Sequence, residues 1–339
     1  MPSKDNFVNR LNVATWILSG LALLFVLVAH LLPALLAALL VYELVHMVAS
    51  RIRIKQLQGT KPKLVAIALL AALIVSTLIA AIVGIATFFH SDAGNLSMLL
   101  QKMAEILEGS KSTMPAWMVQ YIPPNAEGLQ LTIVTWLREH ATEAKTFGKD
   151  AIIAGAHILV GMILGMLISL YEVQSGTALR PLSAALAVRA AKFANAFRRV
   201  VFAQVRIAAI NAFLTWLFLG AALPLAGIHL PLVKTMVALT FLLGLLPVIG
   251  NLLSNAIIII VSLSFSLKAA TISLVFLVVI HKLEYFLNAK IVGSQIKAHA
   301  WEILLAMLAM ESIFGLNGVI AAPIYYAYLK DELSSQKLI

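Results

Sequence analysis

The sequence has no cysteine, and it lacks the short motifs that mark the common soluble enzymes. Without cysteine the chain forms neither disulfides nor thiolate metal sites. No phosphate-binding GxxxxGK[ST] segment is present, which argues against ATP hydrolysis, and neither HExxH nor GxSxG occurs. The histidines show no spacing typical of metal ligands. These absences predict a protein that is not an enzyme and that needs no metal or cofactor.

Charge is also scarce. Only 12% of the 339 residues are charged, whereas 61% are hydrophobic and the mean hydropathy is +0.97. A typical soluble domain is about a quarter charged, so this balance indicates a chain solvated largely by lipid. Several apolar stretches reach the roughly 20 residues that a helix needs to cross a bilayer, and alternating strand patterns do not occur. We therefore expect an all-α fold, a polytopic helical membrane protein of the inner-membrane type.

The formal net charge of +10 could indicate a nucleic-acid binder. The basic residues, however, collect in short segments between apolar runs, which is typical of cytoplasmic loops. We expect no nucleic-acid partner and a multi-pass protein of the bacterial cytoplasmic (inner) membrane. The same rule places the N- and C-termini in the cytoplasm.

Three membrane helices are expected in residues 1–89. The stretch 11–42 carries no full charge and is too long for one upright helix. His30 and Pro33 mark a natural turn, so we interpret this stretch as a hairpin of two short helices. Residues 64–89 form the third span.

The next two soluble segments differ in charge. Residues 90–150 hold seven acids against five bases and are expected to form an extracytoplasmic helical cap, after which 151–171 recross the membrane. Residues 172–206 are strongly basic and alternate with small apolar residues, which predicts an amphipathic connector at the inner surface that contacts anionic lipid. We expect a C-terminal transport core over 207–330 and a cytoplasmic tail over 331–339.

Two apolar runs in this core are interrupted by glycine. GLLPVIGN (244–251) breaks the run 235–267, and FGLNG (314–318) breaks the run 301–329. Each half of the first run is short for an upright crossing, which favours re-entrant hairpins. Broken helices of transporters expose carbonyls and helix ends that hold ions or polar substrates. The alternative is that glycine and proline simply permit close helix packing. The broken-helix residues are Gly244, Pro247, Gly250, Gly293, Gly315, Gly318 and Pro323.

Ionisable and amide side chains near membrane depth supply the candidate transport pathway. Glu284 shares a helix face with His281 and with Asn288, and such a cluster could handle protons or cations. Glu311 lies inside the last apolar run, where a carboxyl is expected to be buried and functional. The alternative for the first cluster is an ordinary interfacial position. The full candidate set is Glu284, Glu311, His281, Asn288, Asn251 and Asn317.

The C-terminal half resembles the autoinducer-2 exporter family, the PerM-type permeases. A PxIG element is matched by Pro247 and Gly250, and a second element by Glu284 and Gly293. A third element is matched by Gly315, Gly318, Ala322 and Pro323. Ala289 stands where the family usually has proline. The order of the earlier segments also resembles the family, so the resemblance covers nearly the whole chain.

The resemblance implies an integral inner-membrane permease of about eight membrane segments that assembles as a homo-oligomer. It also implies a secondary transporter that exports a small polar solute such as autoinducer-2. An Na⁺(Li⁺)/H⁺ antiporter is the first alternative, and a non-transporting membrane scaffold is the second. Small residues permit close helix packing, within one chain or between subunits; examples are Ala34, Ala37 and Ala38, or Gly155, Gly161 and Gly165.

Overall fold

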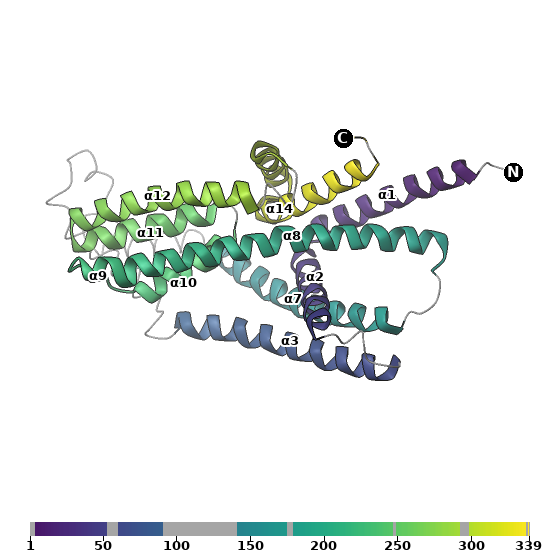
Figure 1. Cartoon of the computed structure of the whole chain (residues 1–339), viewed down its shortest axis with the longest axis horizontal. Coiled ribbons are helices and arrows are strands. Elements are labelled where there is room, and N and C mark those ends of the chain that lie inside the picture. The colour runs from purple at the N-terminus through teal and green to yellow at the C-terminus, as the bar shows by residue number, and fades with distance from the viewer. Residues whose placement is uncertain are drawn as a thin grey trace. The chain divides into compact units, whose positions relative to one another are not determined.

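The computed structural model describes residues 4–52, 60–90, 141–174, 179–246, 249–291, 298–336 and 338. All regular structure in these residues is helical, which confirms the predicted fold class (Figure 1). Six of the helices are long and apolar enough to cross a membrane, and two shorter apolar helices accompany them. The chain is a polytopic membrane protein. The expected cap lies mostly outside the described residues.

The helices form two compact units. The first unit comprises Met1–Ala80, Asp150–Val201 and Val292–Ile339, and the second comprises Ala81–Lys149 and Phe202–Ile291. The expected transport core, 207–330, is therefore shared between both units. Each unit has its own clusters of buried apolar side chains.

The first unit contains α1 (Lys4–Val28), α2 (Leu32–Arg51), most of α3 (Thr60–His90) and of α7 (Ala141–Gln174), and α14 (Ala300–Ser335). It also holds the first part of α8 (Pro181–Leu217). The predicted turn between the first two helices is confirmed: His30 adopts a left-handed φ of 54° and Pro33 opens α2. Residues 181–217 form one continuous helix, without a break between the expected connector and the span after it.

A close seam joins α2 to α7 within this unit. A Cβ atom on Gly161 would overlap the backbone of Ala34, and one on Gly165 would overlap that of Ala38. Both contacts advance by four residues, so the two helices run parallel. In lipid, helices associate through such close packing, because the tails outside are as apolar as the helix faces. These small residues therefore pack within one chain.

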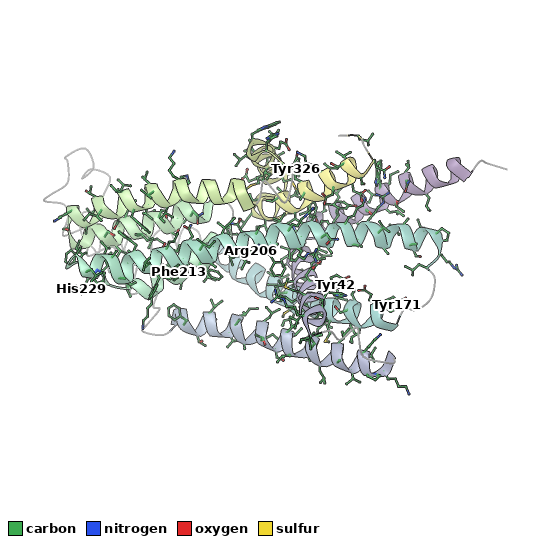
Figure 2. All side chains as sticks on the ribbon, viewed as in Figure 1. Tyr42, Tyr171, Arg206, Phe213, His229 and Tyr326 are labelled. Carbon is green, nitrogen blue, oxygen red and sulfur yellow. The ribbon has the colours of Figure 1, made fainter. Side chains whose placement is uncertain are left out.

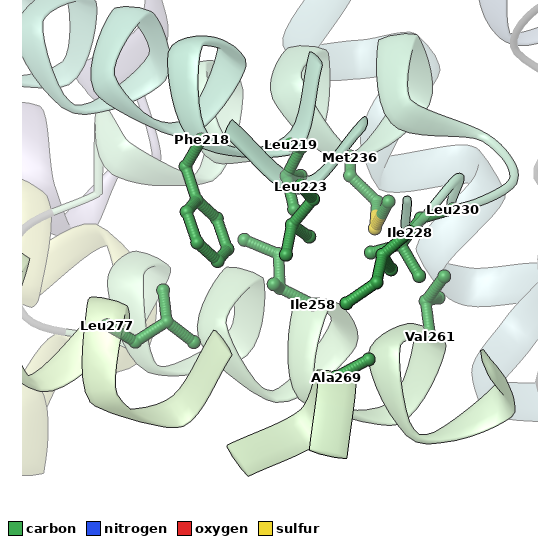
Figure 3. Close-up of a cluster of buried hydrophobic side chains, with 10 residues drawn as sticks. All are labelled: Phe218, Leu219, Leu223, Ile228, Leu230, Met236, Ile258, Val261, Ala269 and Leu277. Atoms are coloured by element: carbon green, nitrogen blue, oxygen red, sulfur yellow. The ribbon is translucent and has the colours of Figure 1, made fainter. Parts of the chain in front are cut away.

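The second unit contains the end of α8, a π-helical turn η3 (Phe218–Ala222), α9 (Leu223–Leu225), α10 (Val233–Gly244), α11 (Ile249–Phe265) and α12 (Leu267–Ile291). Its core is a cluster of buried apolar side chains from all these elements except the end of α8 (Figure 3). The rings of Phe218 and Phe276 stack with centroids 3.8 Å apart at its margin. Ser262 of α11 and Ser273 of α12 share a buried hydrogen bond of 2.8 Å.

Candidate functional site

The first glycine-broken run folds back on itself between α10 and α11. The two helices have 12 and 17 residues, or about 18 and 26 Å at 1.5 Å per residue, so α10 is too short to cross about 30 Å of hydrocarbon upright. A Cβ atom on Gly250 would overlap the carbonyl oxygen of Leu243, and Gly244 is buried against Ala208 and Asn251. Glycine is required here because the backbones touch. The structure thus forms the hairpin that the sequence favoured.

A side chain of α8 completes the end of α10. Gln204 donates its Nε2–H to the carbonyl oxygen of Gly244, with an N–O distance of 2.7 Å. The last carbonyls of any helix have no partner within the helix, and an unsatisfied one is costly in an apolar region. The amide of Gln204 therefore stabilises the break in the run.

Two buried amides lie just beyond this contact. Asn211 of α8 and Asn251 of α11 are only 7% and 8% exposed, and the Asn211 Nδ2 donates to the Asn251 Oδ1 at 3.4 Å. Ser254, also buried, donates its hydroxyl to the Asn251 carbonyl oxygen at 3.1 Å. Together Gln204, Asn211, Asn251 and Ser254 form what we call the amide cluster. Its members are neutral and can both donate and accept hydrogen bonds.

The sequence identified only Asn251 of this cluster. Gln204 and Asn211 are seven residues apart, so both lie on one face of α8. The sequence placed Gln204 in the basic connector, which ends at 206, and Asn211 in the transport core that follows. Their shared helix face was therefore not recognised. Their spacing on a single helix is the signal that could have found them.

The second glycine-broken run forms a hairpin inside α14, in the first unit. Gly315 has a left-handed φ of 58° with ψ −141°, and the helix reverses there. A Cβ atom on Gly318 would overlap the carbonyl oxygen of Met310. At the open end of this hairpin, Lys330 donates to the Glu302 Oε2 at 2.6 Å. The expected break at FGLNG is therefore an antiparallel hairpin whose arms are held by an ion pair. Tyr326 also donates to Glu302.

Charged side chains anchor the second arm of α14 to its neighbours. Glu332 accepts from Arg189 at 2.8 Å, with both side chains 6% exposed, and from Lys192 at 3.1 Å. Arg189 also donates to the Thr15 hydroxyl at 2.6 Å and lies over the Trp16 ring. Arg199 pairs with Asp331 in the same region. Three of the bases expected to contact lipid from the basic connector are thus paired inside the protein.

The other sequence candidates fare differently. Glu311 is exposed on the chain, so the expectation of a buried carboxyl is wrong, and Asn317 is half-buried. Gly315 is exposed, and Pro323 is buried. His281 lies exposed on α12. The side chains of Glu284 and Asn288, and all of Pro247 and Gly293, lie outside the described residues. A role in transport stays a prediction for each of these residues.

The amide cluster has the chemistry of a site for polar groups. In the part of the chain that the structure describes, no three His, Cys, Asp or Glu side chains gather where they could hold a metal ion. Amides buried in apolar surroundings need hydrogen-bond partners, and each can exchange a protein partner for a solute hydroxyl or carbonyl. The arrangement can therefore exchange hydrogen bonds with a polar solute.

Comparison with known proteins agrees with this architecture. Residues 11–335 match the family model described as AI-2E family transporter. The chain is also 26% identical over 213 residues to "Putative transport protein YdbI" of Bacillus subtilis (strain 168), a match that covers 60% of this chain and 59% of that protein. The match to the family model spans both units and both hairpins. The chain therefore belongs to the AI-2E transporter family, and its helices make it a multi-pass membrane protein.

Proposed function

We propose that this transporter exports a small, neutral polar solute such as autoinducer-2, and that the amide cluster at the α10–α11 turn lines part of its pathway. The observation that carries the proposal is the pair of buried amides, Asn211 and Asn251, beside a helix break that only glycine permits. Polar groups and broken backbone at membrane depth are tolerated where they line a wet cavity or are buried in protein.

The test is export from proteoliposomes that hold the purified, full-length protein. Vesicles are loaded with autoinducer-2, and its loss to the outside is followed for the wild type, Asn251→Leu and Asn211→Leu. We expect wild-type efflux well above that of empty vesicles. Both variants should lose most of that efflux. Thr77→Val is the matched control, because Thr77 is exposed and its hydroxyl donates to the Leu73 carbonyl oxygen of its own helix.

Two results would overturn the proposal. Wild-type efflux equal to that of empty vesicles, with correctly inserted protein, would exclude autoinducer-2 as the solute. Full efflux in both asparagine variants would exclude the amide cluster from the pathway. In the first case, other small polar solutes are tested in the same vesicles.

A second candidate function is Na⁺(Li⁺)/H⁺ antiport. It is favoured by ionisable side chains inside apolar helices, above all Glu43, which is 5% exposed, and by the untested candidates Glu284 and Glu311. Its test is a pH-sensitive dye inside the vesicles during a step of Na⁺ or Li⁺. A cation-dependent proton flux that Glu284→Gln or Glu311→Gln removes would establish antiport, and no flux would count against it.

The setting of the transporter is part of the same proposal. The positive-inside distribution supports a bacterial inner membrane with both termini in the cytoplasm. Exposed bases that remain on or beside α8, Arg180 and Arg206, are where anionic lipid is expected to bind. A homo-oligomer also remains part of the proposal. Its interface must use surfaces other than Gly161 and Gly165, which face α2 of the same chain.

A further inference from the structure

The buried face of α8 continues beyond the amide cluster into the second unit. Asn211 is followed after four residues by Thr215 and after eight by Leu219, and both of these side chains are buried. Residues four apart share a helix face. Arg206 and Phe213 lie exposed on the other face of this helix (Figure 2). From the amide cluster onward, the buried face therefore changes from amide to hydroxyl to hydrocarbon.

The helices α10 and α11 show a similar order. From Gly244, the buried Thr240 lies one turn back along α10, and the buried Met236 lies two turns back. The Thr240 hydroxyl donates to the Met236 carbonyl oxygen at 2.8 Å, so its own oxygen can still accept a hydrogen bond from a solute. On α11, the buried Ile258 follows Asn251 by seven residues. All three helices thus reach a buried apolar side chain about 10–12 Å from the amide cluster, at 1.5 Å per residue.

These three apolar side chains belong to one packed cluster. Figure 3 shows Leu219, Met236 and Ile258 in the same close-up, and each is at most 1% exposed. The layer that they form is therefore closed as the structure stands. Water and ions would have to give up their hydrogen bonds to enter it, and apolar constrictions of this kind close channels. The Ser262 hydroxyl, one turn beyond Ile258, bonds to Ser273 of α12 and takes no part in the layer.

Leu219 lies where the regular hydrogen bonding of the helix changes. It belongs to the π-helical turn η3, in which the Leu223 N–H bonds to the Phe218 carbonyl oxygen, five residues earlier. Pro224 has no N–H, so the carbonyl of Gly220 cannot receive the usual bond from four residues ahead. Single π-helical turns occur frequently at functional sites. A change of this turn to α-helical bonding would rotate Leu219 relative to the residues that follow, which gives the layer a way to open.

We propose that Leu219, Met236 and Ile258 form a hydrophobic gate, and that Thr215 and Thr240 bind the solute between the amide cluster and this gate. The inference rests on the proposed function, because it takes the amide cluster as one end of the pathway. In the closed state the gate keeps water and ions from crossing the second unit. When Leu219 rotates away, the polar solute moves on from the threonine hydroxyls.

The test is a leak, which a residue that only supports the fold would not produce. Met236→Ser places a hydroxyl in the gate, and the full-length protein is reconstituted in vesicles without autoinducer-2. Light scattering follows the entry of erythritol, and a fluorescent indicator follows the entry of Na⁺, with empty vesicles as the baseline. Leu277→Ser is the matched control, because Leu277 is buried in the same cluster but lies on α12. Ile258→Thr, a smaller change in the gate, is measured beside them in case Met236→Ser does not insert.

We expect Na⁺ entry at the baseline for the wild type, and entry of both probes several-fold faster for Met236→Ser and Ile258→Thr than for Leu277→Ser. Both serine variants should melt at similar temperatures, since both bury a hydroxyl in the same core. Thr215→Val, added to Met236→Ser, should slow the entry of erythritol again. If it does not, Thr215 is not part of the pathway.

Two results overturn the gate. One is baseline entry of both probes in Met236→Ser and Ile258→Thr with the protein inserted. The other is a leak in Leu277→Ser as large as in Met236→Ser, because any serine in the core would then suffice. The proposed function is read separately, from autoinducer-2 efflux. Loss of efflux in Asn251→Leu without a leak in the gate variants removes the gate alone, and a leak with full efflux in Asn251→Leu removes the amide cluster alone.

Discussion

The two glycine-broken hairpins solve the same backbone problem and then differ in where they place polar groups. In both, glycine lets one arm touch a carbonyl of the other: Gly250 meets Leu243, and Gly318 meets Met310. The α10–α11 hairpin has neutral amides at its turn, where Gln204 binds the Gly244 carbonyl. The α14 hairpin has its charges at the open end, where Lys330 binds Glu302.

This difference separates a turn that can exchange hydrogen bonds from one that is anchored. A neutral amide pair contributes little energy and can open for a solute, because interhelical hydrogen bonds in membranes average about 0.6 kcal/mol. A buried ion pair resists opening, because removing one partner leaves an uncompensated charge. We infer that α10–α11 is the working hairpin and that α14 is held in place. Four comparisons between variants test this distinction.

The largest effect is expected where the α14 arm is anchored. Glu332→Gln leaves the buried guanidinium of Arg189 without its carboxylate partner. Breaking a buried ion pair costs about 3–5 kcal/mol, so the melting temperature in detergent should fall sharply. Tryptophan fluorescence follows it, and Trp16 lies beside the pair. Arg180→Gln, at an exposed position, should melt like the wild type. Equal melting of the wild type and Glu332→Gln would contradict the anchored role of α14.

The glycines of both turns should show intermediate effects. Gly250→Ala and Gly318→Ala each force a methyl group against a backbone carbonyl, and overpacking of this kind costs about 1–3 kcal/mol. Gly84→Ala is the matched control, since a Cβ there meets nothing within 4 Å. Thermal unfolding of the three variants should separate the first two from the third. A Gly84→Ala variant as unstable as the others would mean that the close backbone contacts do not matter.

The amide cluster should show a small stability effect and a large transport effect. Asn211→Leu removes one interhelical hydrogen bond, worth about 0.6 kcal/mol in stability. Export of autoinducer-2 should nevertheless fall strongly. Glu302→Gln is the contrasting variant: it weakens the Lys330 ion pair of α14 and should lower stability more than it lowers export. If both variants reduce stability and export in the same proportion, the proposed difference between the α10–α11 hairpin and the α14 hairpin is contradicted.

The smallest effect is expected within the helix pair that supports the working hairpin. Ser262→Ala removes a buried hydroxyl pair between α11 and α12, and we expect a loss of about 0.6 kcal/mol with export retained. Denaturant titration and the vesicle assay measure the two quantities. Export abolished by this single hydroxyl would extend the pathway from the turn into the body of α11.

The sequence predicted the helical class, the first hairpin and both glycine breaks, because each depends on local signals. Long apolar runs set the helices, and His30 with Pro33 set the first turn. Glycine and proline marked the breaks. Such signals are readable along the chain without knowledge of what packs against each helix.

Contacts between distant segments were not readable in this way. Glu332 is bound by Arg189, 143 residues away, so a base expected to face lipid is buried in protein. Glu311 was expected to be buried because its neighbours are apolar, but lipid-facing residues of a membrane protein are apolar too, and this residue is exposed. Gln204 was hidden by a boundary that the continuous α8 does not have.

The most direct measurement of the central claim is autoinducer-2 efflux by Asn251→Leu, in proteoliposomes matched to the wild type for inserted protein. We predict an efflux close to that of empty vesicles with a melting temperature close to that of the wild type. Wild-type efflux in this variant would contradict the account, because the buried amide at the α10–α11 turn would then have no part in transport.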